Sequence, residues 1–151
     1  MDNNRYSKFF LFILLSLGIC ACGQLKASSD QVCFENTCFD VEIADEREEL
    51  MRGLMFREAM PSDHGMVFIF PNLTVHDFWM KNTLIPLDMI WMDYNRKIVH
   101  IESHVPPCEK DPCPSYGPQQ ASLYVLELNA GVAEQKGLRP GMIASFKFPS
   151  L

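Results

Sequence analysis

The sequence has no excess of basic residues and no motif that cradles a phosphate. It contains 13 lysines and arginines against 19 aspartates and glutamates, which gives a net charge of −6. An acidic chain without a basic stripe repels a nucleic-acid backbone, so we expect no nucleic-acid partner. Because a phosphate loop and a dinucleotide fingerprint are both missing, an ATP-, GTP- or NAD-dependent enzyme is disfavoured, and we expect no cofactor.

The sequence also lacks the pattern of a nucleophilic enzyme. Ser103 and His104 are merely neighbours along the chain, and Ser122 has no glycine-flanked elbow around it. We therefore lean against an enzyme and assign no catalytic residue.

Long apolar runs are missing except for one near the N-terminus. Arg5 and Lys8 precede the apolar run 9–17, and small residues follow it up to residue 23. This is the order of regions in a signal peptide, and the run is shorter than the roughly 20 apolar residues that a membrane-spanning helix needs. We predict that residues 1–21 are a signal peptide that is removed on export.

Cys22 lies where a bacterial lipoprotein would receive its lipid. Ile19 stands three places before it and the small Ala21 stands directly before it. Cys20 fits less well because the β-branched Ile19 precedes it, and cleavage without lipid attachment is the other alternative. We predict an exported protein of the periplasm or cell envelope, anchored to a membrane by lipid on Cys22, with residues 22–30 as its tether.

Four further cysteines form two runs of identical spacing, each with four residues between the cysteines. In an exported protein they are expected to form disulfides, and the turn-forming residues inside each run favour local pairing. Four cysteines allow three connectivities, and the sequence leaves them open. A zinc site or a redox pair is the alternative, but neither has its usual spacing or context, and we predict no metal site. The four are Cys33, Cys38, Cys108 and Cys113.

Residues 31–151 are predicted to form a single domain that is mainly β. Alternation, apolar runs and turn residues predict about seven strands, one main helix over 45–55 and one short helix over 131–136. No rhythm of parallel strands and crossover helices is present. Residues 104–120 hold five of the ten prolines, so we expect a long stiffened loop there, and such loops are often functional. The predicted strands are 32–34, 38–44, 65–70, 75–81, 87–92, 97–102, 121–128 and 142–148.

Two carboxylates lie inside apolar strands, where a charge is out of place unless it is paired, exposed or used. Asp88 lies within 84–92, and Glu127 lies between Leu126 and Leu128. A structural role, with each carboxylate bound to backbone groups or to Lys81 or Arg57, is one interpretation. A paired-carboxylate site of the kind that hydrolyses glycosidic bonds is the other.

Trp79, Lys81 and Asn82 are candidates for a ligand-binding cleft. In an alternating strand, Phe78 and Met80 share one face, while Trp79 and Lys81 share the other. If the first pair is in the core, the second pair supplies an exposed aromatic plate with hydrogen-bond donors, which suits a small polar ligand. The alternative is that the proline-rich loop covers Trp79, because tryptophan is highly buried on average.

Methionines and histidines are dense in one stretch of the chain, and soft thioether and imidazole ligands would select Cu(I). The more common role of methionine is to fill space in a core. The residues concerned are Met51, Met55, Met60, His64, Met66, His76 and Met80.

Several ordered motifs together resemble the family called domain of unknown function 192, whose members are small and frequently exported prokaryotic proteins. The motifs are Gly53 to Arg57, Gly65 to Phe70, Phe78 to Thr83 and Pro86 to Asp88, followed by later landmarks between Pro107 and Gly141. The resemblance covers about residues 39 to 147. It implies a compact β-sandwich or barrel-like domain with a helix packed on it, and it supplies no catalytic residues.

The sequence thus favours a lipid-anchored accessory domain that binds a small polar ligand or an envelope partner. The expected cleft combines Trp79, Lys81, Asn82, Asp88 and Glu127 with the 104–120 loop. The alternatives are an envelope carbohydrate hydrolase that uses Asp88 and Glu127, and a copper-binding protein.

Overall fold

The computed structural model describes residues 29–149, and its strands form one large sheet and one small one. The predicted signal peptide, Cys22 and most of the predicted tether lie outside the described residues. The large sheet has seven strands in the order β6-β5-β8-β3-β2-β1-β9, and the small sheet pairs β4 with β7. The strands are β1 (Gln31–Phe34), β2 (Thr37–Ala44), β3 (His64–Thr74), β4 (Phe78–Trp79), β5 (Leu87–Met92), β6 (Ile98–Val105), β7 (Ser115–Tyr116), β8 (Ser122–Asn129) and β9 (Ala144–Lys147).

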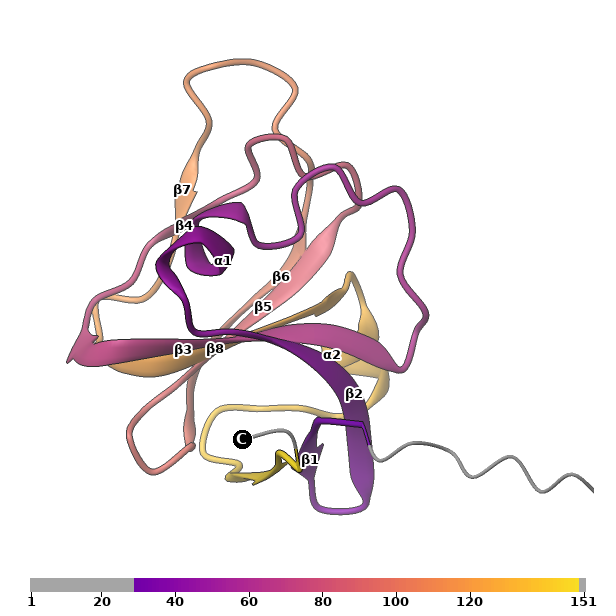
Figure 1. The fold of residues 1–151 in the computed structure, drawn as a ribbon, viewed down its shortest axis with the longest axis vertical. Coiled ribbons are helices and arrows are strands. Elements are labelled where there is room, and N and C mark those ends of the chain that lie inside the picture. The colour runs from indigo at the N-terminus through magenta and orange to yellow at the C-terminus, as the bar shows by residue number, and fades with distance from the viewer. Residues whose placement is uncertain (1–28, 150–151) are drawn as a thin grey trace, which may run out of the picture.

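The large sheet curls so that its two edge strands approach each other at one end. Lys97, just before β6, bridges to Ile143, just before β9, and the Ile98 N–H donates to the Met142 carbonyl at 2.8 Å. In Figure 1 β1 and β9 curl below the central strands β3 and β8, while α1, β4 and β7 lie above them. The predicted mainly β, barrel-like class is confirmed: the domain is a half-barrel with two short helices.

One strand pair in the large sheet is parallel. β2 and β3 run in the same direction, with Asp40 opposite His64 and Ala44 opposite Phe68, and α1 (Arg47–Arg52) lies in the connection between them. The sequence has no repeating rhythm of parallel strands and crossover helices, and this single parallel pair was not predicted from it. A single crossover with a six-residue helix leaves too little periodicity to be recognised.

Helix α1 is shorter than the predicted 45–55. It begins after Glu46, whose backbone N–H donates a hydrogen bond to the Glu49 carboxylate at 3.4 Å. The capping box therefore starts one residue later than expected. It ends at Gly53, whose φ of 47° and ψ of −135° suit glycine almost alone. The second helix, α2 (Val132–Gln135), is likewise shorter than predicted.

The sheet separates two apolar cores because successive side chains of a strand point to opposite faces. One core lies inside the curl and includes Ile90, Leu126 and Leu128 together with residues of α2. The other lies on the outer face, where Met89, Trp91 and Val125 pack beneath α1 and β4. Every residue of β5 is buried, since this strand has a core on each side.

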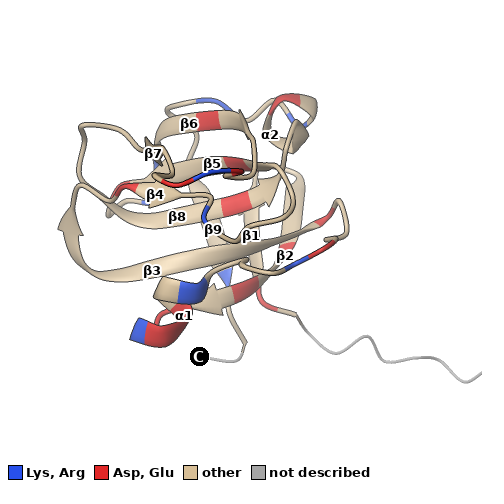
Figure 2. Ribbon diagram, turned by 90° about the horizontal axis from the view of Figure 1, so that it is seen from above, with Lys and Arg blue, Asp and Glu red and all other residues tan. Residues whose placement is uncertain are grey.

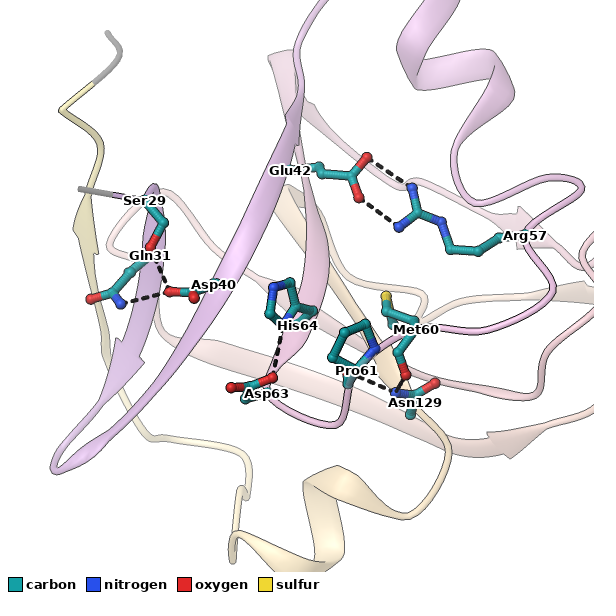
Figure 3. A network of polar contacts seen from close by, with 10 residues as sticks. All are labelled: Ser29, Gln31, Asp40, Glu42, Arg57, Met60, Pro61, Asp63, His64 and Asn129. Atoms are coloured by element: carbon teal, nitrogen blue, oxygen red, sulfur yellow. Dashed lines mark hydrogen bonds and ion pairs between the residues drawn. The ribbon is translucent and has the colours of Figure 1, made fainter. Parts of the chain in front are cut away.

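Polar contacts attach the 57–64 segment to the sheet, as Figure 3 shows. Arg57 makes a two-pronged ion pair with Glu42 of β2, at 2.6 and 2.8 Å. The Asn129 amide at the end of β8 donates to the Met60 carbonyl at 2.9 Å and to the Pro61 carbonyl at 3.1 Å. These contacts fix the chain that follows α1, and therefore the position of the helix over the outer face.

Both local disulfides are present, and they join Cys33 to Cys38 and Cys108 to Cys113. Disulfides persist in oxidising compartments, so the pair indicates a location outside the reducing cytoplasm. Within residues 29–149, none of the helices has the length and apolar character that a membrane crossing requires.

Candidate functional site

A small pocket opens on the outer face of the sheet, where α1 and β4 meet the central strand β8. It holds about 40 Å³ of free space. A single water needs roughly 10–15 Å³, so the pocket admits a few waters or one small polar group. We call it the Glu127 pocket; it is lined by residues 50–55, Phe68, Phe78, Trp79, Thr83 and Glu127.

Glu127 is the chemically unusual residue of this pocket. It lies in β8 opposite Met66 of β3 and Met89 of β5, both of which are buried, and only 4 % of its own surface is exposed. Among the described residues, none forms a hydrogen bond or ion pair with its carboxyl group. Burial without a compensating partner raises the pKa of Glu127 to about 8. At neutral pH the group is mainly a carboxylic acid, which both donates and accepts hydrogen bonds.

Trp79 forms an exposed aromatic wall at the mouth of the pocket. The alternation of the strand buries Met80 and packs Phe78 edge-on against Phe68 and Trp91, which leaves 53 % of Trp79 exposed. The proline-rich loop therefore does not cover this tryptophan.

Lys81 connects Trp79 to the disulfide-closed loop. Its Nζ lies 5.7 Å from the centre of the Trp79 ring and 3.2 Å from the Asp111 carboxylate. Lys81 and Asn82 line a second hollow of about 200 Å³ with residues of the loop between Cys108 and Cys113. Lys81 therefore lies beside Trp79, but the predicted cleft is divided: Trp79 and Glu127 line one pocket, and Lys81 and Asn82 line the other.

Asp88 does not belong to this cleft. Met89 lies opposite Glu127, so the neighbouring Asp88, opposite Leu128, points to the other face of the sheet. Asp88 is fully buried, and its two carboxylate oxygens accept hydrogen bonds from the backbone N–H groups of His104 and Ala133, each at 2.8 Å. Ala133 lies in the first turn of α2, so Asp88 holds that helix against the sheet.

The opposite orientation of Asp88 and Glu127 removes the paired-carboxylate site. An acid and a base that act on one glycosidic bond must flank it from the same cavity. Here the two carboxyl groups face opposite sides of the sheet, so Asp88 and Glu127 do not flank one bond as an acid and base pair. The proposed cleft is corrected by leaving Asp88 out.

The methionines and histidines of the copper alternative are held by different neighbours. Met66 and Met80 are buried in the outer core, where they fill space. His64 Nδ1 lies 2.7 Å from the Asp63 carboxylate, whereas the His76 ring stacks on Phe70. In the part of the chain that the structure describes, the group suited to a metal combines Cys108, Asp111 and Cys113, and its two sulfurs are joined in a disulfide.

The contribution of α1 to the pocket was not predicted from the sequence. Leu50, Arg52 and Gly53 line it, because the crossover between β2 and β3 lays the helix over Glu127. Thr83, which is buried, is a further polar lining residue beside Arg52 and Glu127. The Gly53-Leu54-Met55-Phe56-Arg57 motif could have indicated that this segment takes part in the site. Only the fold shows which strand the motif faces.

Comparison with known proteins agrees with this fold and with the earlier resemblance. The model of the family described as "Uncharacterized ACR", domain of unknown function 192, matches residues 30–146. The chain belongs to the domain of unknown function 192 family.

Two curated relatives in this family are UPF0127 protein TK1120 of Thermococcus kodakarensis and a UPF0127 protein of Thermococcus gammatolerans, each 27 % identical over 111 residues. These matches cover 70 % of this chain but only 64 % and 65 % of the relatives, so the chain spans less than two thirds of their length.

Two crystal structures share the family fold. A protein from Sinorhizobium meliloti, provisionally described as a transcription regulator, is 31 % identical with a TM-score of 0.70; the match covers 78 % of this chain and 91 % of that one. A protein of unknown function from Novosphingobium aromaticivorans is 30 % identical with a TM-score of 0.70, over 77 % of this chain and 82 % of that one.

Proposed function

We propose that this member of the domain of unknown function 192 family is a binding domain that accepts a small neutral polar group of its ligand in the Glu127 pocket. The observation that carries the proposal is the Glu127 carboxyl group, buried in the pocket wall without a hydrogen-bond partner among the described residues. The carboxyl group faces the water-accessible space of the pocket, so a ligand group that enters can form hydrogen bonds with Glu127 in place of water.

The surroundings of Glu127 favour a neutral ligand group over a charged one. With a pKa of about 8, Glu127 is protonated at neutral pH and matches an amide or a hydroxyl, which also donates and accepts. Trp79 at the mouth offers an apolar face for the part of the ligand outside the pocket. A nucleic-acid ligand is not proposed, because 19 acidic residues outnumber 13 basic ones, and Figure 2 shows residues of both charge signs on α1.

Binding is tested by titrating the folded domain with acetamide and N-methylacetamide while recording amide chemical shifts. We expect shifts in α1, Thr83 and the Trp79 indole. Glu127→Leu should abolish them, whereas Glu127→Gln, which keeps a donor and an acceptor, should retain them. Tyr94→Ala serves as the control, because Tyr94 is an exposed aromatic residue in the turn after β5. Equal shifts in the wild type and in Glu127→Leu would refute the proposal.

We also propose that the protein is exported and anchored to a membrane through lipid on Cys22, within the cell envelope. The two disulfides support export, and the lipoprotein-like residues before Cys22 support the anchor. The test is to express the full chain in a bacterium and to determine the mass of its N-terminal peptide and its partition into detergent. Cys22→Ala should remove the lipid mass and the membrane fraction, whereas Cys20→Ala should leave both unchanged. The anchor is refuted if Cys22→Ala remains lipidated.

A further inference from the structure

A second, larger pocket continues from the Glu127 pocket along β4. It holds about 220 Å³, more than the roughly 150 Å³ cavity that accommodates a benzene ring. We call it the Val75 pocket; its lining is Leu50, Phe70, Val75, His76, Asp77, Phe78 and Trp79. Leu50, Phe78 and Trp79 line both pockets, so the two form one groove. Its larger end combines apolar side chains such as Phe70 and Val75 with the polar His76 and Asp77.

The groove follows the open side of strand β4. β4 is paired only with β7, and neither pocket is lined by a residue of β7. Among the described residues, β4 has no second strand partner on the edge opposite β7. An unpaired strand edge is a template for the backbone of another chain.

We infer that this groove binds an extended segment of a partner polypeptide, which adds as a strand beside β4. This inference rests on the proposed function, because the Glu127 pocket is one half of the groove. A small polar side chain of the segment occupies the Glu127 pocket, and an apolar side chain two residues further on occupies the Val75 pocket. Residues i and i+2 of a strand point to the same face, roughly 6.5–7 Å apart, so one segment can supply both groups.

The charges at the two ends of the groove give the segment a direction. Arg52 lines the Glu127 pocket and Asp77 lines the Val75 pocket. Within residues 29–149, neither side chain forms an ion pair with another residue. A segment with an acidic residue beside its small polar residue, and a basic residue beside its apolar one, complements both ends.

The unequal size of the two pockets favours a polypeptide over a glycan. A glycan presents rings of similar size at each step, and a ring does not fit the 40 Å³ of the Glu127 pocket. A polypeptide alternates small and large side chains freely and also has backbone donors and acceptors for the β4 edge. An anionic membrane is disfavoured as the occupant by the net charge of −6.

The test uses the folded domain and the capped peptide Ac-Asp-Ser-Ala-Phe-Lys-NH2. We expect amide shifts confined to α1, β4 and Thr83, quenching of Trp79 fluorescence, and an affinity at least tenfold above that of N-methylacetamide. Two control peptides change one feature each. Exchange of the terminal charges, in Ac-Lys-Ser-Ala-Phe-Asp-NH2, should weaken binding about threefold, as expected for exposed ion pairs. N-methylation of the central alanine should weaken it further by blocking strand addition.

Protein variants separate a binding role from a folding role. Trp79→Ala should reduce peptide affinity at least tenfold without changing the unfolding midpoint, because Trp79 is half exposed. Tyr94→Ala should change neither quantity. If Trp79→Ala proves destabilised, Val75→Ser, at another exposed position of the groove, provides the same comparison.

The outcomes distinguish this inference from the proposed function. If acetamide binds but the peptides bind no more tightly, the polypeptide groove is refuted and the Glu127 pocket remains a binding site. If the N-methylated peptide binds as well as the parent, strand addition is refuted. Tighter Trp79-dependent binding of chitotriose, or of phosphatidylcholine–phosphatidylglycerol vesicles, would overturn the choice of a polypeptide. If neither acetamide nor any peptide binds, both proposals fail.

Discussion

Asp88 and Glu127 are both buried carboxyl groups on adjacent central strands, but they differ in their hydrogen-bond partners. Asp88 accepts two backbone hydrogen bonds on the inner face of the sheet. Glu127 faces the pocket on the outer face and lacks such partners among the described residues. A carboxyl group that stabilises the fold through backbone bonds is a structural element, whereas one that destabilises it beside a pocket is a candidate for function.

Glu127 makes the stability of the domain dependent on pH. Its pKa is about 8 in the folded state and near 4.5 when unfolded, so the folded state binds the extra proton between these values. The free energy of unfolding should therefore fall as the pH rises from about 4.5 to 8, by up to about 1.4 kcal/mol per pH unit, and then level off. Urea unfolding of the wild type and of Glu127→Gln at several pH values measures the difference. Parallel pH profiles of the two proteins would contradict this account.

Asp88 should contribute to stability and not to binding. Asp88→Ala leaves the N–H groups of His104 and Ala133 buried without an acceptor, which should lower the free energy of unfolding by about 2–5 kcal/mol. Asp88→Asn keeps one acceptor oxygen and should lose less. Chemical denaturation measures both changes. Acetamide shifts in the pocket should persist in Asp88→Asn, since the sheet separates the two sites; their loss would show that Asp88 does contribute to the pocket.

At the scale of elements, α1 determines the shape of the pocket and also illustrates what sequence patterns miss. The helix itself was predicted, but over residues 45–55, so its start was placed too early and its end at Gly53 was not recognised. The face that it covers depends on the parallel pairing of β2 with β3, which is a contact between segments that are distant in sequence. Local propensities carry no information about such a pairing.

Gly53 is the residue on which the end of α1 depends. Gly53→Ala should lower the free energy of unfolding by about 1–3 kcal/mol, because its backbone angles suit glycine and an added Cβ would lie 3.0 Å from the Phe68 ring. Gly137→Ala is a matched control, since Gly137 also has a positive φ, of 67°, but has open space around the added atom. The difference between the two variants, measured by thermal or urea unfolding, reports the contact with Phe68 together with the ψ of −135° at Gly53. Equal losses would show that this contact has no effect.

For the whole molecule, the two disulfides close short loops, one in each half of the chain. Each joins cysteines five positions apart, and a loop of this length corresponds to about 2 kcal/mol in the chain-entropy model. Full reduction should therefore lower the free energy of unfolding by about 4 kcal/mol, a large part of the stability of a small domain.

Urea unfolding with and without a reductant measures the effect of the disulfides. The double variants Cys33→Ser with Cys38→Ser, and Cys108→Ser with Cys113→Ser, separate the two contributions. The second pair should also loosen the ion pair between Lys81 and Asp111. An unchanged unfolding midpoint after complete reduction would contradict a stabilising role.

The amino-acid sequence by itself determined most of the strand segments and favoured the local cysteine pairs, which the structure confirms. Each of these depends on residues that lie close together along the chain, through alternation, turn chemistry and short loops. Only the tertiary structure decided that Glu127 shares a pocket with Trp79 and α1 while Asp88 faces the other core. The physical reason is strand register: shifting one strand by a single residue would exchange its two faces, and the register is determined by packing across the whole sheet.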